Sequence, residues 1–305
     1  MVQTKVLPYD AGAIAEAARL IGEGLPVGVP TETVYGLAAD ATRGEAVARI
    51  YEAKGRPSFN PLIVHVLDVG QAETVAEFDV QAQELAERHW PGPLTLVLPL
   101  RPGSPIASLV TAGLPTVAIR APAHPAMRDL LVAAGRPLAA PSANASGRIS
   151  PTRAEHVLAS LGGRISLIVD GGPTGHGLES TIVAVSGGRV RLLRPGPIDL
   201  GLVIDLSGNV EAPGQLESHY APARPLRLDA TAAAADEWLI GFGEVAGDAS
   251  LSRSGDLVEA AAGLFDRLHE AERQDRPRIA VAPIPDKGIG RAINDRLRRA
   301  AAPRR

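Results

Sequence analysis

The sequence contains no cysteine among its 305 residues. Disulfide bonds, thiolate metal ligands and a thiol nucleophile are therefore excluded. No apolar run is long enough to cross a bilayer. The first ten residues also lack the charged, apolar and small-residue regions of a secretory signal peptide. These absences predict a cytoplasmic protein without a membrane segment.

Lysine is scarce, because only Lys5, Lys54 and Lys287 are lysines among the 31 basic residues. Where arginine is used so widely, a lysine such as Lys54 is a candidate for a chemically specified ammonium group. The formal net charge of the chain is -3. Such a balance gives no overall attraction for a polyanion, so we expect no strong direct binding to nucleic acid.

Several common catalytic and nucleotide-binding signatures are also missing. The glycine-rich run "GGPTGHGLES" lacks the lysine of a P-loop, and no G-x-G-x-x-G opens a helix after a strand. There is no H-E-x-x-H or G-x-S-x-G, and the seven histidines are not placed at metal-ligand spacing. A nucleotide site, if present, must be built in another way.

Short apolar runs bounded by proline or glycine predict β-strands through the first two thirds of the chain. The last two runs flank Gly187 and Gly188, which is a hairpin signal, so part of the sheet is expected to be antiparallel. The predicted strands cover residues 25–30, 61–66, 94–100, 116–122, 137–143, 166–172, 180–185 and 189–196.

Helices that cover this sheet are predicted between the strands. Capping boxes, in which a threonine would accept from a free backbone N–H, are expected to start two of them, at Thr42 to Glu45 and at Thr152 to Glu155. Apolar stripes at helical spacing predict the others, at residues 12–24, 80–90 and 124–135.

The pattern changes near residue 205, where a stretch rich in proline and glycine has no periodicity. Strand-like runs and helical runs then alternate to the end of the chain, which is typical of a small open α/β layer. One helical face is predicted at Leu257, Ala261, Leu264, Phe265 and Leu268. We therefore predict a catalytic domain over residues 1–205, an interdomain linker over 206–225 and a small C-terminal α/β domain over 226–305.

Lys54 and Arg56 stand where a helical pattern ends at Gly55, beside Pro57. Cations in the last turn of a helix commonly complement the negative end of its dipole. A fixed pair can instead bracket a polyphosphate, with arginine as a planar fork and lysine as a point charge. The sequence leaves both interpretations open.

The segment "APSANASGRISPT" places Ser142, Asn144, Ser146, Ser150 and Thr152 after a strand. A polar loop that ends in a helix needs no ligand. Hydroxyl and amide groups at the start of a helix are, however, also a way of holding phosphate oxygens without a P-loop. The density of donors favours a phosphate site.

Polar side chains also occupy or adjoin other strand ends, namely Glu32, Thr33, His65 and Arg120. Burial of an unpaired guanidinium is strongly unfavourable, so Arg120 needs a carboxylate from the protein or from a substrate. Glu32 is a candidate partner for Arg120 or for Arg56.

Together these motifs resemble the YrdC-type catalytic domain of L-threonylcarbamoyl-AMP synthases. The runs "PTETVYGL", "KGRP", "NPLIVHV", "WPGPLTLVLP", "TVAIRAP", "APSAN", "ESTIV" and "LRPGPI" occur in the family's order. The linker and the small α/β unit resemble the long, two-domain form. The resemblance implies an α/β (α+β) fold with a twisted, mixed sheet containing antiparallel strands, flanked by helices, and a small Rossmann-like C-terminal domain.

The resemblance also implies a reaction in which L-threonine, bicarbonate or CO2, and ATP give threonylcarbamoyl-AMP and pyrophosphate. The product would supply other proteins that modify tRNA to threonylcarbamoyladenosine. ATP would be a substrate and Mg2+ an expected cofactor. Its ligands are left open, because nothing in the spacing of Asp170 and Glu179 requires a metal. We expect a monomer.

Residue roles follow from the same resemblance. The catalytic set would be Lys54, Arg56, Ser142 and Asn144. Threonine would be bound by Thr33, His65, Arg120, Ala140 and Ser180, and ATP by Arg56, Asn60, Thr116, Ser142, Ser150, Arg194 and Tyr220.

Two alternatives stay open at this point. One is a YrdC-type module that binds RNA and lacks this activity, for which RNA binding would depend steeply on salt. The other is an enzyme that carbamoylates a different amine or activates a different amino acid, which substrate dependence would reveal.

Overall fold

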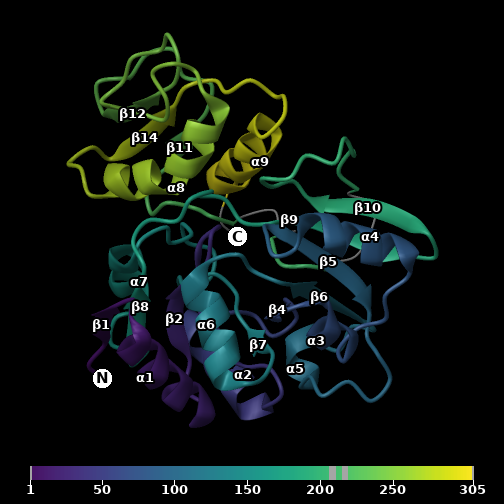
Figure 1. Cartoon of the computed structure of the whole chain (residues 1–305). Helices are drawn as coiled ribbons and strands as arrows, with labels where there is room; N and C mark the ends of the chain where they lie inside the picture. The colour runs from purple at the N-terminus through teal and green to yellow at the C-terminus, as the bar shows by residue number, and fades with distance from the viewer. Residues whose placement is uncertain (1, 206–210, 215–218, 304–305) are drawn as a thin grey trace.

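The computed structural model describes residues 2–205, 211–214 and 219–303. A large sheet with helices on both faces forms most of the molecule, and a smaller sheet with two helices lies against one end of it (Figure 1). None of the described helices is long and apolar enough to span a membrane.

The large sheet has the strand order β1-β8-β2-β3-β7-β4-β6-β5-β9-β10. It is mixed, since β4 and β6 are parallel whereas β9 and β10 form the antiparallel hairpin predicted around Gly187 and Gly188. The predicted α/β class with antiparallel strands is confirmed. The strands are β1 (Lys5–Pro8), β2 (Val27–Pro30), β3 (Tyr35–Asp40), β4 (Ile63–His65), β5 (Leu94–Pro99), β6 (Thr116–Arg120), β7 (Leu138–Ala139), β8 (Leu167–Asp170), β9 (Thr181–Ser186) and β10 (Arg189–Arg194).

Helices bury apolar side chains against both faces of this sheet. On one face α1 and α6 lie side by side and share a cluster that includes Leu20, Val29 and Leu130. Asp10 caps α1 by accepting from the N–H of Ala13, as its short side chain allows. The helices are α1 (Ala11–Gly22), α2 (Gly44–Lys54), α3 (Val69–Glu73), α4 (Val80–His89), α5 (Ser108–Thr111), α6 (Pro125–Ala134) and α7 (Ala154–Leu161).

Both predicted capping boxes are wrong. α2 has Arg43 as its N-cap residue and α7 has Arg153, and neither side chain makes a capping hydrogen bond. The Thr42 hydroxyl donates instead to Asp40 Oδ1 at 2.7 Å. The Thr152 hydroxyl lies 3.4 Å from His156 Nδ1. Each helix therefore begins one residue too late for its threonine to act as the cap.

The C-terminal unit is an open α/β layer. Its four strands are all parallel, in the order β11-β14-β12-β13. Of the predicted helical face, Ala261, Leu264, Phe265 and Leu268 are buried in the apolar cluster of this unit, and Leu257 is half-buried against it. The elements are β11 (Leu226–Arg227), β12 (Glu237–Gly241), β13 (Ala249–Ser250), α8 (Leu257–Glu272), β14 (Arg278–Val281) and α9 (Gly290–Ala301).

The two units are packed together. Val34, Ile149 and Leu178 of the large unit belong to the same apolar cluster as Phe265 of α8. The rings of His156 and His269 stack across this contact with centroids 3.8 Å apart. The boundaries at residues 205 and 225 stay predictions, and within the predicted linker residues 206–210 and 215–218 lie outside the described residues.

Gly177 shows how close this packing is. A Cβ atom there would lie 2.3 Å from the carbonyl oxygen of Ala262 in α8, and its φ of 67° is left-handed. We predict that Gly177→Ala lowers the free energy of unfolding by about 2 kcal/mol or more, through overpacking and backbone strain. Urea denaturation measures this change.

Gly175→Ala is the matched control, since a Cβ at Gly175 meets no atom within 4 Å. This variant should stay within about 0.5 kcal/mol of the wild type. Equal stability of the two variants would contradict the close contact between Gly177 and α8.

Candidate active site

A pocket lies where several strand ends of the large sheet meet the linker. β4 and β6 are parallel neighbours, so their last residues, His65 and Arg120, are register partners at the same edge. Nine of the residues predicted from the sequence line this pocket: Thr33, Arg56, His65, Arg120, Ala140, Ser142, Ser180, Arg194 and Tyr220.

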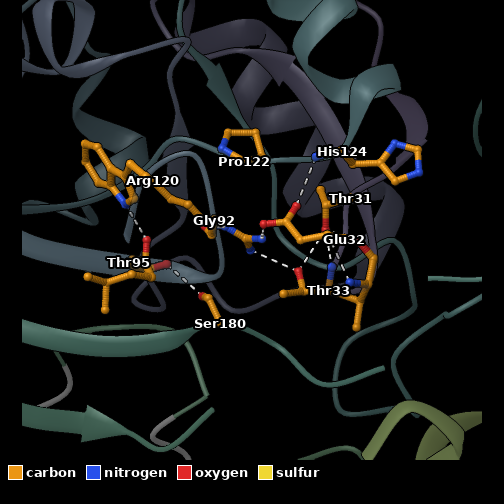
Figure 2. Close-up of polar contacts among 12 residues, drawn as sticks. Thr31, Glu32, Thr33, Gly92, Thr95, Arg120, Pro122, His124 and Ser180 are labelled. Atoms are coloured by element: carbon orange, nitrogen blue, oxygen red, sulfur yellow. Dashed lines mark hydrogen bonds and ion pairs between the residues drawn. The ribbon is translucent and has the colours of Figure 1, made fainter. Parts of the chain in front are cut away.

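Arg120 is held in place by three partners. It donates from Nη2 to Glu32 Oε1 at 2.5 Å and from Nη1 to Thr33 Oγ1 at 2.9 Å. Its Nε donates to the carbonyl oxygen of Gly92 at 3.1 Å (Figure 2). Burial opposes the ionisation of Glu32, but the charge of Arg120 and its hydrogen bond outweigh this and lower the pKa of that carboxyl. The protein thus supplies the carboxylate that a buried Arg120 requires.

Arg56 and Arg194 are buried differently, because they donate mainly to backbone carbonyls. Arg56 donates from Nη2 to Pro61 O at 2.9 Å, and Arg194 donates from Nη2 to Ser180 O at 2.9 Å. Burial lowers the pKa of Arg56 to about 10 and also lowers the pKa of Arg194. Within the described residues neither guanidinium forms an ion pair with a carboxylate. Their positive charge is therefore available to an anion in the pocket.

Ser180 joins this cationic side of the pocket to β5. Its hydroxyl lies 2.7 Å from the hydroxyl of Thr95 and 3.1 Å from Arg194 Nη2. Figure 2 marks the contact with Thr95 by a dashed line. Two neighbours thus hold the Ser180 hydroxyl in place at the pocket wall.

His65 contributes a neutral ring. Burial, together with the charge of Arg120, lowers its pKa to about 3. Its Nδ1 is buried and has no hydrogen-bond partner among the described residues. A buried polar atom without a partner is costly, so this nitrogen is a candidate contact for a bound ligand.

Lys54 does not line the pocket. Its Nζ donates to the carbonyl oxygens of Ser142 and Asn144, at 2.5 Å each. Burial, and then the charge of Arg56, lower the pKa of Lys54 well below its ordinary value. The Lys54 side chain thus contacts the loop that carries Ser142, and the catalytic role expected of Lys54 stays a prediction.

Four other predicted residues also lie outside the pocket wall. Asn144 donates from Nδ2 to Arg148 O at 2.8 Å, and Ser150 donates to Glu179 Oε1 at 2.5 Å. Asn60 is buried, and its Oδ1 has no partner among the described residues. Thr116 starts β6, at the opposite end from Arg120. The roles expected of these four residues stay predictions.

Two polar wall residues that were not among the predicted substrate-binding residues are His219 and Glu179. His219 lines the pocket beside Tyr220, with ring centroids 4.1 Å apart. Glu179 also lines it, although the sequence suggested only a metal ligand there. The one available signal was adjacency, because each precedes a predicted site residue, Tyr220 or Ser180.

Comparisons with known proteins cover the whole of this architecture. Residues 19–196 match the family described as telomere recombination, and residues 198–302 match the threonylcarbamoyl-AMP synthase C-terminal domain. Threonylcarbamoyl-AMP synthase of Bacillus subtilis is 42% identical over 99% of this chain and 96% of its own length. The chain belongs to the threonylcarbamoyl-AMP synthase family.

A second curated member of the threonylcarbamoyl-AMP synthase family, from Pyrococcus abyssi, is 40% identical over 93% of each chain. The crystal structure of P. abyssi Sua5 complexed with L-threonine superposes with a TM-score of 0.90. It is 37% identical and covers 98% of both chains. The two-unit arrangement of this protein is therefore that of a solved threonylcarbamoyl-AMP synthase.

The neutral state of His65 gives a pH prediction. Its pKa is about 3 when folded and about 6.5 when unfolded, so between these values the unfolded state binds the additional proton. The contribution of His65 to the free energy of unfolding is therefore fully present above pH 6.5 and is lost as the pH falls. The maximal slope is about 1.4 kcal/mol per pH unit. We predict a shallower fall in the free energy of unfolding for His65→Asn between pH 6.5 and pH 4.

Urea denaturation at a series of pH values measures the two slopes. Identical slopes for the wild type and His65→Asn would show that His65 titrates in the folded protein as it does in the unfolded chain.

Proposed function

We propose that this protein is an L-threonylcarbamoyladenylate synthase, which converts L-threonine, bicarbonate or CO2, and ATP into threonylcarbamoyl-AMP and pyrophosphate. The observation that carries the proposal is the presence of Arg56 and Arg194 in one pocket, both buried and without a carboxylate partner within the described residues. A polyanion is the ligand that such a pair requires.

The threonine end of the pocket is proposed at Thr33, His65, Arg120, Ala140 and Ser180. A guanidinium carries more N–H groups than the three that Arg120 uses with Glu32, Thr33 and Gly92, so the rest can donate to the carboxylate of an amino acid. The P. abyssi Sua5 structure is a complex with L-threonine, which supports threonine as a ligand of this protein.

The nucleotide end is proposed at Arg56, Asn60, Thr116, Ser142, Ser150, Arg194 and Tyr220. The free volume of the pocket is about 50 Å³, whereas typical ligand pockets hold roughly 300 Å³ or more. Pro213, Gly214, His219 and Tyr220 form one wall. We infer that this wall moves aside when ATP enters.

The proposed reaction needs no nucleophile from the protein. The amine of threonine attacks CO2 and loses a proton to give a carbamate. A carbamate oxygen then attacks the α-phosphorus, and the bond to pyrophosphate breaks. Arg56 and Arg194 stabilise the charge on the phosphoryl oxygens and on the leaving group, while Lys54 and Asn144 maintain the loop that presents Ser142. By this reaction the enzyme is a nucleotidyltransferase.

Mg2+ is proposed to enter with ATP. The described residues contain no group of three or more His, Asp or Glu side chains that could hold a metal ion. Mg2+ commonly keeps several water ligands and is bound through substrate phosphates, so it does not require such a group of side chains. The metal would neutralise charge on the departing pyrophosphate.

Three further assignments are proposals that follow from this activity and from the sequence. The product would pass to proteins that complete the modification of tRNA. The protein would act as a monomer without strong direct binding to nucleic acid. A cytoplasmic location also stays a prediction from the sequence.

An assay of pyrophosphate release tests the activity. We predict release from ATP that requires both threonine and bicarbonate, because the carbamate must form before the α-phosphorus is attacked. Mass spectrometry should detect threonylcarbamoyl-AMP in equal amount. Release that continues when threonine is omitted would refute the proposal.

The supporting role of Lys54 is tested with a second variant. We predict that Lys54→Met lowers kcat for pyrophosphate release by about tenfold or more, because two buried carbonyl groups lose their charge-assisted donor. Circular dichroism should show the wild-type fold. Lys287→Met, at an exposed lysine, should retain wild-type turnover. Equal turnover of the two variants would rule out a role for Lys54.

A further inference from the structure

Arg296 of α9 connects the C-terminal unit to the pocket. It has an exposed fraction of 0% and is the largest fully buried side chain among the described residues. Its Nε donates to Glu179 Oε2 at 2.7 Å, and its Nη2 donates to the carbonyl oxygen of Pro195 at 3.0 Å. Its guanidinium carbon lies 5.2 Å from the centre of the Tyr220 ring. One side chain of the C-terminal unit thus contacts two residues of the pocket wall.

Glu179 is the carboxylate at this wall. Among the described residues that line the pocket, no other side chain carries a carboxylate. Both of its oxygens are engaged, since Oε1 accepts from the Ser150 hydroxyl and Oε2 accepts from Arg296. Ser150 is fixed on its other side as well, because its carbonyl oxygen lies 3.1 Å from His269 Nε2 of α8.

The charges around Glu179 explain why Arg296 matters to the pocket. Asp295 lies next to Arg296 in the chain and pairs with Arg296 at 2.7 Å and with Arg299 at 3.1 Å. Without Arg296, the carboxylate of Glu179 would lose its cationic partner at the pocket wall and would weaken the field of Arg194, whereas Asp295 would stay paired with Arg299. A carboxylate at the wall of a triphosphate site repels the ligand unless a cation cancels its charge.

We infer that Arg296 is a positioning residue for ATP: it cancels the charge of Glu179 and so keeps the Ser150 hydroxyl and the Tyr220 ring at the nucleotide side of the pocket. The inference rests on the proposed function and deepens it, because it gives the C-terminal unit a part in nucleotide binding. Arg296 does not line the pocket and acts only through its neighbours.

A purely structural role for Arg296 makes a different prediction. Loss of packing between the two units would weaken the binding of threonine and ATP alike. Loss of charge cancellation acts on the polyanion selectively, since ATP carries several negative charges whereas the threonine zwitterion has none overall. The ratio of the two affinities therefore separates the two roles.

The test uses the full chain. Isothermal titration should show that Arg296→Gln weakens the binding of MgATP by about tenfold or more, because the variant leaves a buried carboxylate unpaired. Threonine binding should change by less than about threefold, which is within the range of a distant substitution. In turnover assays the KM for ATP should rise while the KM for threonine is maintained.

Removal of the opposing charge should restore the site. We predict that the double variant Glu179→Gln/Arg296→Gln binds MgATP within about threefold of the wild type, since the two amides are neutral and can still form a hydrogen bond. Arg296→Lys keeps the charge without the planar fork and should lie between the wild type and Arg296→Gln. If Arg296→Gln does not fold, these two variants carry the comparison.

Arg298→Gln is the matched control, because Arg298 is an exposed arginine of the same helix. It should bind both substrates as the wild type does. A folded Arg296→Gln with normal affinity for MgATP, or with equal losses for both substrates, overturns the inference. So does a double variant no better than the single one. If the wild type itself fails to bind MgATP, the proposed function fails instead.

Discussion

Positive charge buried without a carboxylate is the constraint on which the rest of the site depends. Arg56 and Arg194 use backbone carbonyls where an ion pair would be the ordinary solution. This arrangement leaves each charge only partly compensated and so has a cost in the empty protein. The apolar clusters of the large sheet supply the stability that offsets this cost. An anion that enters the pocket compensates the two positive charges and so removes this cost. The relief of that cost adds to the affinity for an anion where phosphate is expected.

Because the partners are carbonyl groups, the positions of the cations are set by the backbone. Lys54 can bind Ser142 O and Asn144 O only if the loop after β7 approaches the end of α2. That approach is fixed by the sheet, in which Gly36 of β3 bridges to Ser142. The fold therefore positions the site through main-chain geometry.

Local patterns predicted much of this structure and missed what depends on distant residues. The hairpin at Gly187 and the helical face of α8 follow from turn chemistry and apolar spacing alone. β3 was not predicted. Its run "YGLAAD" shows no alternation of apolar and polar residues, because every residue of the strand is buried. Packing against neighbours, and not a high β-propensity, stabilises this strand. The convergence of polar strand ends was foreseen, but the contact of Arg296 with Glu179 joins residues 117 positions apart and leaves no local signal.

The two ways of holding a cation divide the pocket into regions of different charge. Arg120 and Arg296 each pair with a glutamate, Glu32 and Glu179, so these regions are close to neutral. Arg56 and Arg194 donate to backbone carbonyls, so their positive charge is not cancelled by a carboxylate. The neutral region at Arg120 is suited to a zwitterion, and the region of Arg56 and Arg194, where Arg296 cancels the charge of Glu179, is suited to a polyphosphate. The C-terminal unit, by supplying Arg296, thereby helps to set which end of the pocket attracts the nucleotide.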